Sequence, residues 1–156
     1  MILNKRVGVL LNLVHNDFKK YLTSVFKSGG YNLTPEQFLL MDALWDDGIQ
    51  SQQTLADTMF KDKNSIVKLI DGLEKRGYVK RITDKNDRRQ NLIKLTNHGI
   101  VLKDDVTRLA MDAVNTIIKD IEKEKLDIFI QVLEAMTFNV RGNKNTYLDI
   151  KNNKDI

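Results

Sequence analysis

Helical periodicity runs through most of this chain but is interrupted at residues 78–95, and that interruption restricts the fold more than any other feature. Apolar residues recur every three or four positions on either side of it. Within it, residues 78–82 and 92–95 have strand-forming composition and enclose a polar loop. The segment therefore predicts a β-hairpin with a long charged tip in an otherwise helical chain.

Two helices are predicted in the first third of the chain. The first covers residues 3–27 and ends at a glycine pair, because glycine supplies the left-handed geometry of a helix stop. The second begins at Thr34, with the only proline of the chain at its first helical position and Gln37 three residues past the cap. We expect Gly48 to end it.

A short and a longer helix come directly before the hairpin. Ser51 is expected to cap a helix over residues 52–59, and Asp62 caps one that continues to Arg76, where Gly77 stops it. A short helix, a tight turn, a second helix and a hairpin make a winged helix-turn-helix. The expected fold class is therefore mainly α, with a small β-hairpin wing.

After the hairpin, Thr96 is expected to cap a new helical stretch, and a charged break at residues 122–125 separates it from a last helix. The terminal helices carry apolar stripes broader than one small head can cover, and a second chain is the simplest cover. We therefore expect helical dimerisation regions, a DNA-binding region and a weakly ordered polar tail. Their ranges are 1–32 with 97–140, 33–96, and 141–156.

The positive charge is concentrated in the middle of the chain. The whole chain has a net charge of +4, whereas eleven cations and five anions between Met59 and Thr96 give that segment +6. A basic middle between near-neutral flanks is typical of a polyanion-binding head, although a lysine-rich solvated surface would give the same charge count.

The helix that starts at Asp62 is the candidate recognition helix. Its apolar residues fall within one arc and are expected to face the core, which leaves a polar face opposite. A helix in the major groove reads bases mainly with its N-terminal residues, although a polar face is also ordinary for a solvated helix. The candidate base-reading residues are Lys63, Asn64, Ser65, Val67 and Lys68. The candidate DNA-backbone contacts, around the preceding helix start and turn, are Ser51, Gln52, Gln53 and Lys61.

The hairpin tip supplies the candidate wing residues. Lys85, Arg88 and Arg89 stand on a protruding loop, where they could enter a narrow, electronegative minor groove. Asp87 lies two residues before Arg89 and is expected to brace its guanidinium group. A floppy charged loop is the alternative, but an arginine pair contributes little to folding at an exposed tip.

Together these segments resemble the MarR family of bacterial regulators. The resemblance extends over about residues 3–140, and the recognition-helix segment and the wing carry its most specific motifs. The wing motif is an Asp-x-Arg followed by an apolar strand that ends in Leu-Thr. The segments that carry the resemblance are residues 33–37, 51–56, 65–79 and 87–96.

The resemblance implies an obligate homodimer that binds pseudo-palindromic promoter DNA, as a sequence-specific transcriptional regulator. It implies a repressor that a small molecule or another signal releases. In the family pattern, Arg89 falls on the minor-groove arginine, Asp87 on its acidic partner and Lys68 on a basic recognition-helix position. Gly72 departs from the pattern, because the family usually has a larger residue there, and glycine loosens a helix by up to about 1 kcal/mol.

Several other classes of protein do not fit the sequence. The chain has no cysteine, which excludes disulfides, a thiolate metal site and the thiol-oxidation sensors of the family. His15 and His98 alone make a poor metal set, so no metal or cofactor is expected. No phosphate loop, nucleophile–base pair or credible carboxylate pair indicates an enzyme. Without a signal peptide or an apolar run of about 18 residues, we expect a cytoplasmic protein.

Two alternatives remain open. Phe18, Tyr21, Met41 and Trp45 could line an effector pocket between the terminal helices and the head, although residues at such spacing are more often plain core. The function could instead be that of a winged-helix module that binds protein and not DNA. Such a module should have a neutral or apolar wing, whereas this wing is basic.

Overall fold

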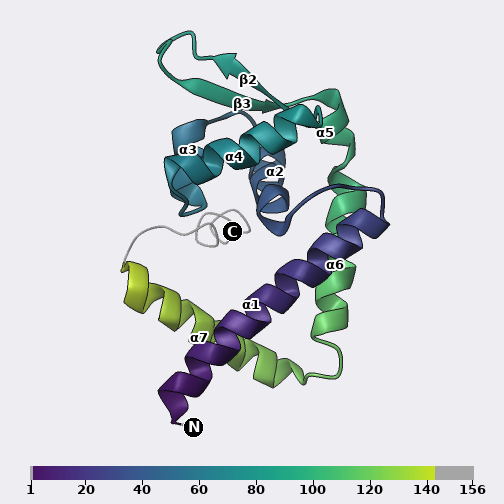
Figure 1. Ribbon diagram of the computed structural model, residues 1–156, viewed down its shortest axis with the longest axis vertical. Helices are drawn as coiled ribbons and strands as arrows, with labels where there is room; N and C mark the ends of the chain where they lie inside the picture. The colour runs from purple at the N-terminus through teal and green to yellow at the C-terminus, as the bar shows by residue number, and fades with distance from the viewer. Residues whose placement is uncertain (1, 143–156) are drawn as a thin grey trace.

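The computed structural model describes residues 2–142 and has the expected winged helix-turn-helix architecture, mainly helical with a small antiparallel sheet (Figure 1). The head stands at one end, and three longer helices extend from it. The helices are α1 (Leu3–Ser28), α2 (Pro35–Asp47), α3 (Gln52–Thr58), α4 (Lys63–Lys75), α5 (Asn97–Val101), α6 (Lys103–Ile117) and α7 (Lys123–Arg141). The strands are β1 (Gln50–Ser51), β2 (Val79–Thr83) and β3 (Asn91–Leu95).

The predicted helix starts of the head are confirmed by their hydrogen bonds. The Gln37 amide N–H donates to the Thr34 hydroxyl at 3.2 Å, and the Thr34 N–H donates to the Gln37 side chain at 3.1 Å, which completes a capping box. Ser51 and Asp62 cap α3 and α4 through side-chain oxygens. These local contacts set the orientation of both helices of the helix-turn-helix.

The sheet has one strand more than the sequence indicated. The wing strands β2 and β3 pair antiparallel, with Arg81 opposite Ile93, and β1 adds to the other edge of β3 through Gln50 and Ser51. A two-residue strand has no periodicity to detect, so only its partner reveals it. The strand matters because β1 leads directly into α3 and ties the start of that helix to the wing.

One apolar core joins the head to the adjoining ends of α1 and α6. Phe26, Leu40, Ile66, Ile70 and Ile93 are all fully buried and come from α1, α2, α4 and β3. The contribution of α6 is Val106, Ala110 and Ala113. The end of α1 is terminated by Gly30, whose φ of 90° suits glycine alone among common residues.

The region after the hairpin differs from the prediction in two details. The stretch that Thr96 caps is divided at Leu102 into α5 and α6. The predicted charged break at residues 122–125 is wrong for its last three residues, which form the first turn of α7, where Lys123 is paired with Asp127 at 2.7 Å. The chain instead turns at residues 118–122, where Asp120 has a φ of 61°.

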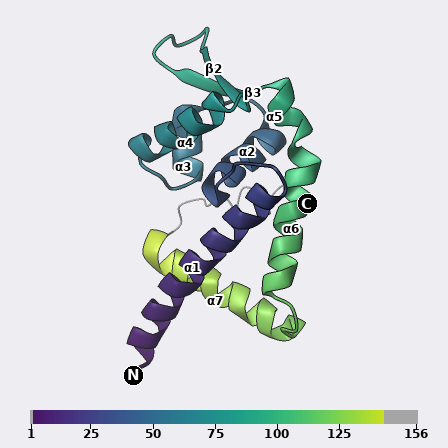
Figure 2. The same ribbon diagram turned by 45° about the vertical axis from the view of Figure 1, so that its right-hand side comes forward.

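Helices α1 and α7 extend beyond the head and leave much apolar surface uncovered. Both views show α6 leading away from the head and α7 turning back at its end (Figures 1 and 2). In the described part of the chain, α7 buries none of its residues, and α1 buries only Leu22 and Phe26. The predicted tail lies outside the described residues from 143 onward. Within the described residues, no helix is long and apolar enough to cross a membrane.

Candidate nucleic-acid interface

The outward face of α4 carries the side chains that the sequence nominated for base reading. Ile66, Ile70 and Leu73 are fully buried, as the periodicity predicted, and the opposite face remains open to solvent. Lys63, Asn64 and Lys68 are exposed, and Val67 is half-buried at the edge of that face. The cationic and amide groups of the first two turns are therefore accessible to a ligand.

Ser65 differs from its neighbours because it is engaged at the helix start. Its backbone N–H and its hydroxyl donate to the two carboxylate oxygens of Asp62 at 2.9 and 2.6 Å. The hydrogen bond from the hydroxyl, followed by that from the backbone, lowers the pKa of Asp62 below its ordinary value. A carboxylate held in this way keeps the hydroxyl proton of Ser65 from other acceptors.

Arg89 of the wing is exposed to solvent, but its backbone N–H and its Nε are held by Asp87. The side chain of Arg89 is 91% exposed, yet its Nε donates to Asp87 at 3.2 Å, so the predicted brace is present. The backbone N–H of Arg89 donates to the same carboxylate at 3.0 Å. The hydrogen bond from the backbone N–H, followed by that from Nε, lowers the pKa of Asp87 below its ordinary value. Lys85 and Arg88 are also exposed on this loop.

A polar cavity of about 170 Å³ lies where the wing meets the starts of α3 and α4. Three segments that the sequence nominated separately therefore converge on one hollow. The predicted residues Ser51, Gln52, Gln53, Lys63 and Arg89 line it, together with Ala56, Gln90 and Asn91. Lys61, in contrast, is half-buried in the turn and does not line this cavity.

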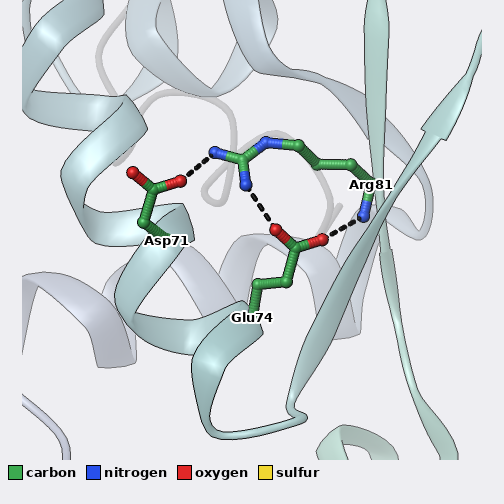
Figure 3. Close-up of polar contacts among 3 residues, drawn as sticks. All are labelled: Asp71, Glu74 and Arg81. Carbon is green, nitrogen blue, oxygen red and sulfur yellow. Dashed lines mark hydrogen bonds and ion pairs between the residues drawn. The ribbon is translucent and has the colours of Figure 1, made fainter.

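Not every cation of the basic middle is available to a polyanion. Arg81 binds Asp71 at 2.6 Å and Glu74 at 2.5 Å (Figure 3). Arg76 donates to the carbonyl of Gly72 at 2.7 Å. The charge count treated both arginines as free. Glutamate and aspartate three residues apart on one helix face, opposite an arginine on the next strand, were the only signal that could have identified the first contact.

The proposed effector-pocket residues differ in their surroundings. Met41 is fully buried in the core, and the indole N–H of Trp45 donates to the carbonyl of Gly99 at 2.8 Å. Phe18 packs against the core, whereas Tyr21 is exposed on α1. None of the four lines the polar cavity. Met41 and Trp45 thus have the core roles that their spacing also allowed. His98, on α5, stacks edge-on against Tyr78 with ring centroids 4.9 Å apart.

Known proteins with the same architecture agree with this geometry. The MarR family model matches residues 33–90, which contain the helix-turn-helix and most of the wing. The HTH-type transcriptional regulator SarZ of Staphylococcus haemolyticus is 26% identical over 137 residues, which cover 88% of this chain and 90% of the relative. Residues 33–90 of the chain thus match the MarR family, and the chain as a whole is similar to regulators of this type.

Solved structures of MarR-type regulators also superpose on this chain. A MarR-family transcriptional regulator from Rhodococcus sp. RHA1 is 26% identical, covers 89% of this chain and 97% of its own, and has a TM-score of 0.74. BpsR of Bordetella bronchiseptica, whose DNA binding is regulated by 6-hydroxynicotinic acid, is 21% identical and has a TM-score of 0.78. It covers 88% of this chain and 96% of its own. SarZ and the Rhodococcus protein are both described as transcriptional regulators.

Proposed function

We propose that this chain is a MarR-family regulator, that it binds a pseudo-palindromic operator as a homodimer, and that it represses transcription until a small molecule releases it. The observation that carries the DNA-binding part is the polar cavity between the wing and the starts of α3 and α4. Gln52 and Gln53 come from α3, Lys63 from α4 and Arg89 from the wing. A duplex against this face would meet all three segments at once.

Each segment then has a different part in recognition. The first turns of α4 lie in the major groove, where Asn64 pairs with adenine, Lys68 donates to guanine and Val67 contacts a thymine methyl group. Arg89 enters the minor groove, oriented by Asp87, and Lys85 and Arg88 bind phosphates beside it. The proposal assigns Ser65 the capping role that its two hydrogen bonds to Asp62 support.

The homodimer is supported by the uncovered apolar faces of α1 and α7. Leu10 and Leu13 on α1 are 47% and 51% exposed, and Phe129 and Phe138 on α7 are 51% and 58% exposed. Monomeric proteins rarely expose contiguous apolar surface on this scale, and two-fold pairing covers the same patch on both chains. The pairing would place two α4 helices about one DNA turn apart, roughly 34 Å.

The proposal of control by a small molecule is based on the similar protein BpsR. Its DNA binding is regulated by 6-hydroxynicotinic acid. Trp45 is the only tryptophan of this chain and lies where α2 meets α5, so its fluorescence reports changes in the head. Aromatic acids can be titrated against the protein–DNA complex while this fluorescence and the bound fraction are followed together. Transcription from the captured operator, with and without protein, distinguishes repression from activation.

The test of DNA binding begins with sequencing of genomic fragments that the purified protein captures. On the operator so identified, Arg89→Ala should weaken binding by roughly fivefold to a hundredfold, because an arginine that contacts bases contributes about 1–3 kcal/mol. Arg108→Ala is the matched control, since Arg108 is 65% exposed on α6, away from the cavity. Equal binding by Arg89→Ala and the wild type would remove the wing from the proposal.

A further inference from the structure

Arg81 connects the candidate recognition helix to the base of the wing. Figure 3 shows its guanidinium group between two carboxylates of α4: Nη2 lies 2.6 Å from Asp71 Oδ1, and Nη1 lies 2.5 Å from Glu74 Oε2. Glu74 also accepts the backbone N–H of Arg81 through Oε1 at 2.9 Å. The side chain of Arg81 is only 22% exposed. We call this group of three residues the Arg81 clamp.

The clamp joins two elements whose relative orientation would decide how DNA is read. Asp71 and Glu74 are three residues apart, so they share one face of α4, next to strand β2. Arg81 is the central residue of β2 and pairs with Ile93 on β3, and β3 continues the chain from the wing loop. A guanidinium group that binds two carboxylates in one plane fixes orientation as well as distance.

The clamp also balances charge beside the candidate base-reading residues. Asp71 lies one helical turn after Lys68, and its side chain is 57% exposed. Without Arg81, two carboxylates would stand uncompensated on α4, close to a bound polyanion. An effect of Arg81 on DNA binding could therefore come from the tether to the wing or from charge alone, and the two origins predict different outcomes.

We propose that Arg81 is a positioning residue for DNA recognition, which holds the wing at the angle to α4 that lets Arg89 and Lys68 contact one duplex together. The inference rests on the proposed function, because it concerns how that same face reads DNA. Arg81 itself touches no DNA in this account. Its side chain is engaged by α4, and it acts through the orientation of the wing.

The first experiment measures the clamp without DNA. The chain lacks cysteine, so Lys75→Cys on α4 and Asn86→Cys at the wing tip provide the only sites for thiol-specific spin labels. Dilution of the labelled chain with unlabelled chain isolates the distances within one subunit. Arg81→Gln should broaden the distance distribution between the labels. A distribution as narrow as that of the unsubstituted clamp would overturn the proposal.

The second experiment is a double-mutant cycle on operator DNA. In the background of Arg81→Gln, the additional loss of affinity caused by Arg89→Ala should shrink by about tenfold, because the untethered wing no longer places that arginine. Full additivity would overturn the proposal. Wild-type protein that captures no genomic fragment in preference to others would instead contradict the proposed function, and the label distances would still report on the clamp.

The third comparison separates the tether from charge. The variant Arg81→Gln, Glu74→Gln removes the cation and one carboxylate, so its net charge on this face equals that of the intact clamp. It should remain about tenfold weaker than wild type on the operator if the tether matters. Recovery of wild-type affinity would reduce Arg81 to a counter-ion. Arg81→Gln could lower the folded fraction. In that case Asp71→Asn, which leaves the contacts of Arg81 with Glu74 in place, should also broaden the distance distribution between the labels, but by less.

Discussion

The head of this protein buries its apolar side chains, whereas the terminal helices leave many of theirs exposed. In the head, Leu40, Ile66 and Ile93 are completely buried by contacts within one chain. Along α1 and α7, Leu13, Ile130 and Phe138 are each at least half exposed. Burial of apolar surface is the main source of folding free energy, so we expect the terminal helices to be completed by the proposed second copy, whereas the head needs no partner to bury its core.

This difference separates two kinds of substitution. Changes in the head should act on folding or on DNA contacts, whereas changes on α1 and α7 should act on subunit association.

Charged residues on the exposed apolar faces should separate the subunits. Leu10→Glu combined with Phe129→Glu would bury two unpaired carboxylates in the proposed interface and raise the dimer dissociation constant by roughly a thousandfold. Sedimentation velocity measures this change. Val101→Glu on α5 is the matched control, because Val101 is 72% exposed but belongs to the head. An unaltered dimer in the double variant would contradict the division between the two regions.

Gly99→Ala should destabilise the head by about 3 kcal/mol, the upper end of the usual overpacking cost. An added Cβ would overlap the carbonyl oxygen of Tyr78 and lie 2.9 Å from its carbonyl carbon, and backbone cannot move aside as a side chain can. Thermal unfolding tests this. Asn97→Ala, exposed in the first turn of the same helix, should leave the midpoint nearly unchanged. Similar midpoints for both variants would show that α5 is not packed against Tyr78.

Lys68→Ala should reduce the preference for operator over random DNA by about tenfold, because a lysine that donates to guanine contributes to discrimination. Lys75→Ala, at the exposed C-terminal end of the same helix, is the control and should leave that preference unchanged. Fluorescence anisotropy on the two duplexes gives both affinities. An equal loss on both sequences would make Lys68 a phosphate contact.

Lys85→Ala should have the smallest effect and should weaken both duplexes alike. Removal of one phosphate contact lowers the slope of log affinity against log salt concentration by about 0.9. A titration series over salt concentration measures that slope. A selective loss on the operator would instead place Lys85 among the base-reading residues.

Local signals account for most of what the sequence predicted correctly. Thr34 with Gln37, Ser51, Asp62 and Thr96 cap helices through contacts within three residues, so their identity and spacing were sufficient. The brace between Asp87 and Arg89 spans two residues and was predicted for the same reason.

The features that the sequence did not reveal depend on contacts between distant segments. Strand β1 exists because Gln50 pairs with Ile93, more than forty positions away. Arg81 was counted with the free cations because its two carboxylate partners lie on another element. The sequence alone indicated Gly72 as a weak point of α4. An added Cβ at this position would lie 2.6 Å from the buried side-chain amide nitrogen of Gln37, so glycine makes room for the capping box of α2.

The stoichiometry of the complex with DNA tests the central claim most directly. Sedimentation equilibrium of the full chain with one captured operator duplex gives the number of chains per duplex, and the same run without DNA gives the free oligomer. We predict a dimer in the absence of DNA and two chains on each duplex. A monomer that binds one per duplex at the full affinity would contradict the account, because the apolar faces of α1 and α7 would then have no partner.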